Sequence, residues 1–275
     1  MSELPTLAIV TGASRGIGAY LAQQLFHETD IIILCARSRE GLLQTASKIE
    51  QMGGTPHCIV GDLCDSEHRK EIIQKVTEMG DLRIIIHNAG VEYAMAFTEQ
   101  SLAQINTQLE LNVHVPILLT HAFLPLLLKQ DYGRVVFISS MSGKSPTPYN
   151  SIYSASKFAI NGFVGSTTLE LKGTGVHMGV VCPSFVAEVG MWASTGVKAP
   201  AMMREVPLKK VLKGVRQVLD ARSHEVLVTP TPVRPLLALY ALFPSLGGWL
   251  LRRLGVWGAL ETRRKVALSR HSPSE

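Results

Sequence analysis

The stretch that decides the fold is IVTGASRGIGAYLAQQL, residues 9–25. Apolar residues of strand length lead into a turn with Gly12, Gly16 and Gly18, and a helical pattern follows. Glycines let the backbone approach a pyrophosphate closely, and the start of a helix offers free N–H groups and a positive dipole end. The spacing GxxxGxG also fits an ordinary glycine-rich turn. Its place directly after the first predicted strand favours a dinucleotide site.

The rest of the chain alternates apolar runs of strand length with helix-length segments. The predicted strands are 6–10, 31–36, 57–60, 83–90, 134–140, 176–183 and 224–230. Continuous β-branched runs indicate strands that are buried on both faces, and their alternation with helices indicates a parallel sheet. We therefore predict an α/β protein, a single-domain Rossmann-like doubly wound sheet of about seven strands. The catalytic domain would span 1–232, and an apolar then basic extension would span 233–275.

The amino-acid composition limits the classes of protein to which this chain can belong. Hydrophobic residues make up 46% of the 275 residues, which is enough for one large core. The four cysteines form no CxxC pair and have no Cys/His ligand spacing, so we expect free thiols in a reducing, cytoplasmic compartment and no metal site. The first ten residues lack a basic region and a long apolar stretch, so we expect no signal peptide. Basic residues are not interleaved with aromatic ones as in a nucleic-acid module, so we expect no nucleic-acid partner.

The residues at the end of the second strand test which dinucleotide is bound. An acidic residue there would bond the ribose 2′-hydroxyl of NAD. Here Ala36 stands in that place, Arg37 follows it, and Arg15 lies inside the glycine loop. Two guanidinium groups suit a 2′-phosphate, which indicates NADP(H). The alternative is that both arginines are solvated surface charges.

The segment YSASK, residues 153–157, places Tyr153 and Lys157 one helical turn apart on one face. An ammonium group beside a phenol favours the phenolate and so lowers the pKa of the phenol. We expect Lys157 to act on Tyr153 in this way and to make it a proton donor and acceptor.

Taken together, the motifs resemble the short-chain dehydrogenase/reductase family, in particular its single-domain NADP-dependent members, over roughly residues 6–230. The elements that carry the resemblance are TGxxxGxG as Thr11, Gly12, Gly16 and Gly18, NAG as Asn88, Ala89 and Gly90, a strand-closing Ser140, YxxxK as Tyr153 and Lys157, and Asn112 in LELNVHV. The chain departs from the family pattern at His87, where an asparagine is common, and at Glu188, where a threonine often meets the nicotinamide amide.

The resemblance implies a catalytic set of Asn112, Ser140, Tyr153 and Lys157. Tyr153 would exchange the proton with the substrate oxygen, and Ser140 would donate a hydrogen bond to that oxygen. Lys157 would also bond the nicotinamide ribose, and Asn112 would hold a water that relays protons. Ser139 and Ser142 compete with Ser140 by proximity.

The same resemblance implies the residues around the ligands. The cofactor would contact Gly12, Ser14, Arg15, Gly16, Ile17, Gly18, Arg37, Asp62, Leu63, Asn88, Ala89, Gly90, Tyr153, Lys157, Pro183 and Val186. The substrate would contact Ser140, Tyr149, Tyr153, Met191 and Trp192. Residues 188–210 would form a substrate lid, made apolar and adaptable by Met191, Trp192, Met202 and Met203. A lipophilic carbonyl or alcohol of the steroid, retinoid, fatty-chain or 3-oxoacyl type is the expected substrate.

Two apolar stretches could contact a membrane or a second subunit. Residues 111–128 carry no charge, but Pro116, Pro125 and two histidines favour a buried or subunit-interface helix over a membrane span. This helix and 152–172 could pair across subunits, so we expect a homodimer or homotetramer.

Residues 235–251 also lack charge and are followed by RRLGVWGAL. The segment 235–265 fits a peripheral anchor on an anionic membrane, but also a cover over the pocket or a subunit interface.

The expected function is an NADP(H)-dependent oxidoreductase that interconverts a ketone or aldehyde and an alcohol. The alternatives are a non-catalytic NADP(H)-sensing or scaffold protein on the same fold and an epimerase or dehydratase acting on a nucleotide sugar. The short C-terminal portion leaves little room for the domain that a sugar nucleotide would need.

Overall fold

The computed structural model describes residues 4–193, 196–197, 199 and 204–269. Seven parallel strands form one sheet in the order β3-β2-β1-β4-β5-β6-β7. The strands are β1 Thr6–Thr11, β2 Ile31–Ala36, β3 Pro56–Val60, β4 Asp81–His87, β5 Gly133–Ile138, β6 Val176–Pro183 and β7 Glu225–Val228. The predicted doubly wound parallel sheet is confirmed.

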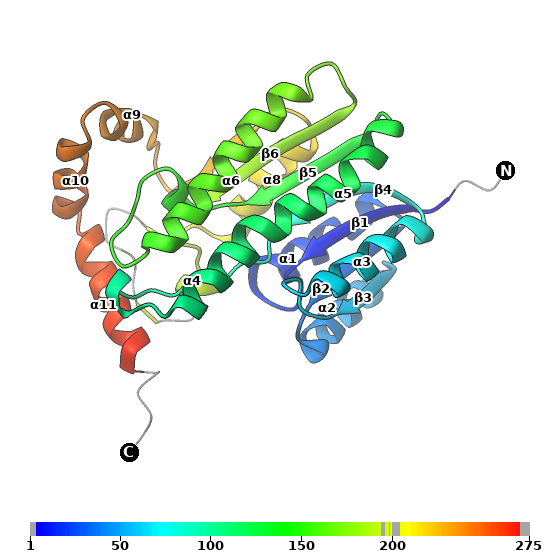
Figure 1. The fold of residues 1–275 in the computed structure, drawn as a ribbon, viewed down its shortest axis with the longest axis horizontal. Coiled ribbons are helices and arrows are strands. Elements are labelled where there is room, and N and C mark those ends of the chain that lie inside the picture. Colours follow the sequence, from blue (N-terminus) through cyan, green and yellow to red (C-terminus); the bar gives the residue numbers. More distant parts are fainter. Residues whose placement is uncertain (1–3, 194–195, 198, 200–203, 270–275) are drawn as a thin grey trace.

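Helices cover both faces of the sheet (Figure 1). One layer consists of α1 Gly16–Leu25, α2 Arg39–Gln51 and α8 Leu208–Leu219, and the other of α3 Ser66–Met79, α5 Val115–Lys129 and α6 Ser151–Glu170. The short elements are η1 Phe26–Glu28, η2 Phe97–Glu99, η4 Met141–Gly143 and α7 Gly190–Ala193. Strand β1 shows why two layers are needed. Ala8 and Val10 pack under the first layer, and Leu7 and Ile9 pack under the second.

The strand order reverses between β1 and β4, so the connections after these two strands leave in opposite directions and open a crevice at their carboxyl ends. Thr11 closes β1 there, and its hydroxyl accepts hydrogen bonds from the backbone N–H groups of Asn88 (3.0 Å) and Ala89 (3.1 Å), just after β4. The two strand ends are therefore held together at the point where a ligand can enter.

The uncharged stretch at 111–128 lies within a longer helical run. Helix α4 Leu102–Leu109, the π-helical turn η3 Glu110–His114 and α5 together form one run, Leu102–Lys129, that is long and apolar enough to cross a membrane by length and composition alone. In the fold, α5 buries Leu119, Phe123 and Leu127 in the core beneath the sheet. We therefore interpret it as a core helix.

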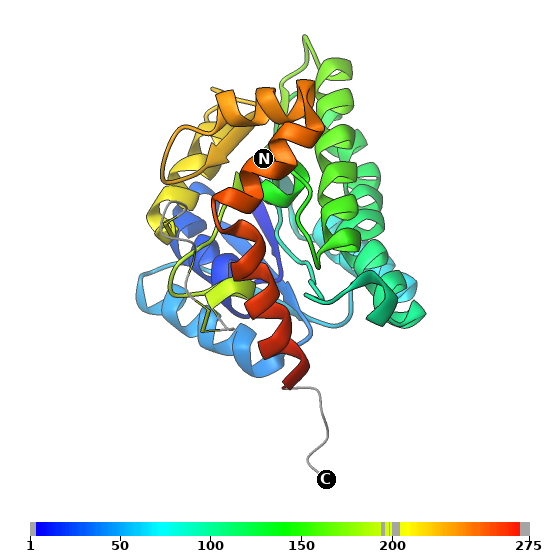
Figure 2. The ribbon, with the colours of Figure 1, turned by 90° about the vertical axis from the view of Figure 1, so that its left-hand side faces the viewer.

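The C-terminal segment forms three further helices, α9 Arg234–Leu242, α10 Pro244–Arg253 and α11 Val256–Ser269. Figure 2 shows α11 lying across the end of the molecule at which the strands of the sheet terminate. Helix α11 contributes Val256 and Leu260 to a small apolar cluster around Trp192 of α7. The extension therefore covers the carboxyl edge of the sheet.

Candidate active site

Two adjoining hollows lie at the carboxyl edge of the sheet. The first, which we call the groove, has a volume of about 1060 Å³ and runs along the loops that follow β1, β2, β3 and β4. The second, which we call the chamber, has a volume of about 170 Å³ and lies between η4, α6, α7 and the C-terminal helices. Six residues line both hollows, namely Ile17, Glu92, Val189, Gly190, Met191 and Arg263.

The glycine loop forms the floor of the groove. Gly12 and Gly16 have φ angles of 68° and 64°, which favour glycine. Gly18 lies in the first turn of α1, and a Cβ there would collide with the carbonyl oxygen of Gly12 and with Nδ2 of Asn88. That Nδ2 donates to the carbonyl oxygens of Thr11 (3.0 Å) and Gly12 (3.2 Å). The three glycines thus allow the loop, the helix and the end of β4 to pack tightly.

We expect Gly18→Ala to lower the free energy of unfolding by about 2 kcal/mol, because the new methyl group must displace the backbone or the Asn88 amide. Affinity for NADPH should fall as well. Gly258→Ala is the matched control, since a Cβ at this exposed position on α11 meets nothing within 4 Å. It should raise the unfolding free energy by up to about 1 kcal/mol. Urea midpoints of both variants test this, and a Gly18→Ala variant as stable as the parent would contradict it.

Most of the predicted cofactor residues line the groove. These are Gly12, Ser14, Arg15, Gly16, Ile17, Arg37, Asp62, Leu63, Asn88, Ala89 and Gly90. Three of the others, Tyr153, Pro183 and Val186, line the chamber, while Gly18 packs behind the loop. Lys157 lies deeper, with its Nζ donating to the carbonyl oxygen of Ile138 at 2.9 Å.

The two arginines that are predicted to select the cofactor lie in the loops at the carboxyl ends of β1 and β2. Arg15 and Arg37 both line it, and Arg37 is largely exposed. Nη1 of Arg37 lies 3.9 Å from Oδ2 of Asp62. Because this contact is long and open to solvent, the guanidinium group is free to turn towards an anion. The groove therefore has the glycine cradle and the cations that a phosphorylated dinucleotide needs.

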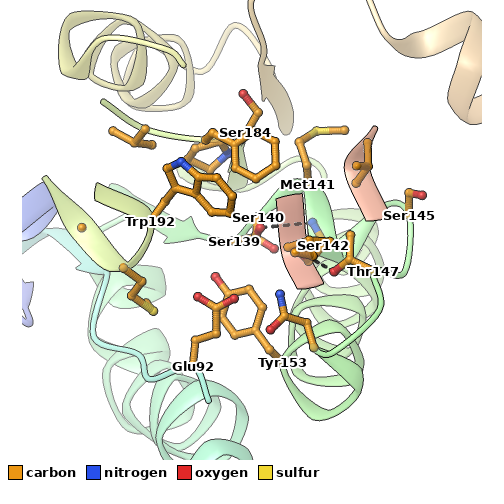
Figure 3. Close-up of a pocket in the computed structure, with 18 of the residues that line it drawn as sticks. Glu92, Ser139, Ser140, Met141, Ser142, Ser145, Thr147, Tyr153, Ser184 and Trp192 are labelled. Atoms are coloured by element: carbon orange, nitrogen blue, oxygen red, sulfur yellow. Dashed lines mark hydrogen bonds between the residues drawn. The ribbon is translucent and has the colours of Figure 1, made fainter. Parts of the chain in front are cut away.

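Ser140 and Tyr153 meet in the chamber (Figure 3). Ser140 follows β5, and its Oγ accepts from the backbone N–H of Ser142 at 3.1 Å, which fixes its rotamer. The Ser140 side chain also acts to lower the pKa of Tyr153, which shows that it acts on the phenol. Of the two competing serines, Ser139 directs its Oγ to the carbonyl oxygen of Lys157 (3.5 Å) and Ser142 pairs with Thr147. Ser140 is therefore the serine that the fold joins to the tyrosine.

The pKa of Tyr153 is not lowered in this structure, contrary to the sequence-based expectation. Burial raises it, the nearby Glu92 carboxylate raises it further, and the Ser140 side chain opposes both. Nζ of Lys157 lies 5.6 Å from the ring centre and donates its hydrogen bond to the carbonyl oxygen of Ile138. Burial also lowers the pKa of Lys157 to about 8, which places its charge change near working pH.

Asn112 sits in the π-helical turn η3 and is buried. Its Oδ1 accepts from the backbone N–H of Val91 at 2.8 Å, and its Nδ2 donates to the carbonyl oxygen of Val91 (2.8 Å) and to Oγ of Ser156 (3.1 Å). The side chain therefore holds the loop after β4 against α6. The proposed water relay stays a prediction.

The predicted substrate residues divide into two groups. Ser140, Tyr153, Met191 and Trp192 line the chamber. Tyr149 does not, because its ring packs beneath the guanidinium group of Arg264, 5.3 Å from the ring centre. Within the predicted lid, Met202 and Met203 lie outside the described residues, and α7 supplies the wall.

Sequence reasoning missed several residues at the border of the two hollows. Val189 and Gly190 lie in the predicted lid, and Glu92 follows the NAG element by two residues, so their proximity to the site could have suggested them. Arg263 comes from α11, far along the chain, and no sequence pattern connected it to the site. Glu188, the departure from the family pattern, has a φ of 69° and lines the groove. Within the described residues, no group of three His, Cys, Asp or Glu side chains is placed to hold a metal ion.

Comparison with known proteins agrees with this geometry. The short chain dehydrogenase family model matches residues 6–199. The ketoacyl reductase HetN of Nostoc is 34% identical over 82% of this chain and 79% of its own length, and the rat estradiol 17-beta-dehydrogenase 11 is 28% identical over 87% and 80%.

Two solved structures extend the comparison. A metagenomic short-chain oxidoreductase in complex with NADP is 29% identical, with a TM-score of 0.69, and the match covers 82% of this chain and 98% of that one. A single-residue variant of the actinorhodin polyketide ketoreductase with NADPH is 26% identical, with a TM-score of 0.72, and the match covers 81% and 95%. Since the family model spans well over half of the 275 residues and HetN exceeds 30% identity, the chain belongs to the short-chain dehydrogenase family.

Proposed function

We propose that this protein is an NADP(H)-dependent oxidoreductase that interconverts a lipophilic ketone or aldehyde and its alcohol. The observation that carries the proposal is the meeting of the Ser140 and Tyr153 side chains in an apolar chamber that adjoins the groove. Reduction of a carbonyl group is promoted by two hydrogen-bond donors at its oxygen. It also requires a hydride source that reaches the carbonyl carbon in a site shielded from water. Two related structures were solved with NADP and with NADPH, which supports the choice of cofactor.

Bound NADPH would supply the hydride, and NADP⁺ would accept it. The glycine loop and the start of α1 would hold the pyrophosphate, while Arg15 and Arg37 would hold the 2′-phosphate. Tyr153 would donate a proton to the substrate oxygen in reduction and take one from the alcohol in oxidation. Ser140 would stabilise negative charge on that oxygen, and Lys157 would return protons to Tyr153.

The chamber wall supports a lipophilic substrate. Its apolar residues come from α7 and from the C-terminal helices, and they include Trp192, Leu236, Leu237, Val256 and Leu260. Trp192 is fixed by the ring of Phe185, with ring centres 4.2 Å apart. The names of two relatives refer to a ketoacyl group and to estradiol, and substrates of both kinds fit such a wall.

The test is NADPH oxidation with a panel of carbonyls graded from short ketones to 3-oxoacyl thioesters, long-chain aldehydes and steroids, with NADH in parallel. We expect turnover that needs NADPH and rises with the apolar size of the substrate. Tight NADPH binding without turnover of any member would instead support the sensing or scaffold alternative.

We also propose that the enzyme is a homodimer or homotetramer that pairs through α5 and α6. Large apolar side chains remain exposed along these helices, namely Leu118, Leu128, Phe158 and Leu169. Sedimentation equilibrium should give at least a dimer mass, and a monomer at micromolar concentration would contradict the pairing.

We also propose that the enzyme is cytoplasmic and docks on an anionic membrane through α9 and α10. Leu242, Phe243, Leu246 and Trp249 are exposed there, the first by 73%. Arg253 lies over Trp249 at 5.3 Å and Arg252 over Trp257 at 4.6 Å from the ring centres. Aromatic and apolar side chains beside cations suit the boundary between headgroups and acyl chains. Leu236, Leu237 and Tyr240 of α9 line the chamber, so a docked enzyme would hold its substrate site near the lipid.

We expect Phe243→Ser/Trp249→Ser to reduce co-sedimentation with phosphatidylserine-containing liposomes at least about tenfold, because two apolar side chains no longer enter the interface. Leu43→Ser/Met52→Ser removes two similarly exposed apolar side chains at α2 and its end and is the matched control. Equal sedimentation of all three proteins would contradict docking. Truncation is unsuitable as a test, because it would also remove chamber walls.

A further inference from the structure

Helix α11 brings Arg263 to the border between the chamber and the groove. Its guanidinium group forms a two-pronged ion pair with Glu92, with Nη1 to Oε1 at 2.5 Å and Nη2 to Oε2 at 2.6 Å. Both side chains are only 6% exposed. Nη2 also donates to the carbonyl oxygen of Met191 at 3.1 Å, and the group lies 5.4 Å from the ring centre of Trp192. One side chain thus joins the C-terminal helix to the loop after β4 and to α7.

The partner of this arginine lies beside the phenol of Tyr153. Glu92 and Tyr153 both line the chamber, and Figure 3 shows them next to each other below Ser140. The charges of Glu92 and Arg263 act on the phenol in opposite senses. A carboxylate without a partner would repel a phenolate, and a paired one is neutralised.

The other titratable groups around the phenol come from α6 and β6. Lys157 of α6 lies under the ring, and Glu92 acts on its ammonium group as well. Cys182 of β6 is a neutral thiol at working pH, because burial raises its pKa to about 11. The charged side chains that act on the Tyr153 phenol are therefore Glu92 and Arg263.

We propose that Arg263 is a positioning residue of the active site, which holds Glu92 beside Tyr153 and cancels its charge. The C-terminal helix thereby completes the electrostatic surroundings of the catalytic phenol, although it lies beyond the 6–199 segment that the family model matches. The proposal rests on the proposed function of Tyr153. A buried ion pair that loses one partner leaves an uncompensated charge. Removing either residue therefore exposes the effect of the other residue's charge on Tyr153.

The sign of the effect follows from the charges. Without the guanidinium group, the negative Glu92 disfavours the Tyr153 phenolate and favours the Lys157 ammonium, so the pKa of both groups rises. Without the carboxylate, the positive Arg263 favours the phenolate and disfavours the ammonium, so the pKa of both groups falls. The pH–rate profile for alcohol oxidation has a limb at which the groups that take up the proton, here Tyr153 with Lys157, must be in the right protonation state. The position of that limb therefore reports their pKa values.

The experiment measures kcat/KM of alcohol oxidation against pH. We expect the limb to move up by about one pH unit in Arg263→Met and down by a similar amount in Glu92→Gln. The double variant should return close to the parent. Arg264→Met is the matched control, because Arg264 lies on the same helix and pairs with Glu99 at the surface. A loss of rate without movement of the limb in Arg263→Met and Glu92→Gln, or an equal movement in Arg264→Met, would overturn the proposal.

A second readout needs no substrate. Carbon-13 NMR of the lysine Cε follows Lys157, whose pKa of about 8 separates it from ordinary lysines, and Lys157→Met assigns the signal. Its midpoint should rise in Arg263→Met and fall in Glu92→Gln. If the parent turns over no substrate but these midpoints move, the proposed function fails and the role of Arg263 stands. If neither midpoint moves, the role of Arg263 fails whatever the activity.

Discussion

Tyr153→Phe is expected to lower kcat about 10³-fold, because the substrate oxygen loses the group that exchanges its proton. The substitution removes one hydroxyl and keeps the buried ring, so the fold should persist. The affinity for NADPH should stay within about twofold, since the groove contains none of the atoms removed. Stopped-flow absorbance at 340 nm measures the rate, and quenching of intrinsic fluorescence measures cofactor binding.

Tyr149→Phe is the control for this substitution. It removes a phenol hydroxyl four residues earlier in the chain, but Tyr149 packs against Arg264 outside the chamber. Its kcat should stay within about threefold of the parent, because the substituted ring still fills the same space. A Tyr153→Phe enzyme with parental kcat would remove Tyr153 from the reaction and favour the sensing alternative.

The double variant Arg15→Ala/Arg37→Ala is expected to reduce the preference for NADPH over NADH at least about 100-fold. Each arginine would give the 2′-phosphate charge-assisted hydrogen bonds worth about 1.5–3 kcal/mol, and 1.4 kcal/mol corresponds to a factor of ten. The kcat/KM for NADH should change little, because NADH has no phosphate at that position. The ratio of kcat/KM for the two cofactors measures the effect.

Arg39→Ala serves as the matched control for the arginine pair. Arg39 begins α2, two residues after Arg37, is exposed and does not line the groove. Its cofactor ratio should equal that of the parent. If the double variant keeps the parental preference, the two arginines are solvated surface charges, and the cofactor selectivity lies elsewhere in the groove.

The sequence predicted the sheet because its signals are local. A run of apolar, largely β-branched residues marks a buried strand, and the spacing of its glycines marks the glycine loop. Both patterns can be recognised without knowledge of distant parts of the chain. Helix α1 after the loop and the order of motifs along the chain are likewise encoded by local sequence patterns. The doubly wound topology follows from them, since right-handed crossovers leave few ways to connect parallel strands.

The groups that surround Tyr153 could not be predicted in the same way. The expectation that Lys157 lowers the pKa of Tyr153 used only their spacing on a helix, and spacing does not report burial, which raises that pKa. The extension after 232 had three open interpretations, because an apolar segment does not state which surface it covers. In the structure its helices line the chamber.

The sequence by itself determined the sheet, the glycine loop and the order of Ser140, Tyr153 and Lys157, because short-range periodicity and spacing encode them. Only the tertiary structure decided that Glu92 and Arg263, 171 residues apart, form a pair beside the phenol. Charges that meet across such a separation act through distance and burial, and both of these exist only once the chain has folded.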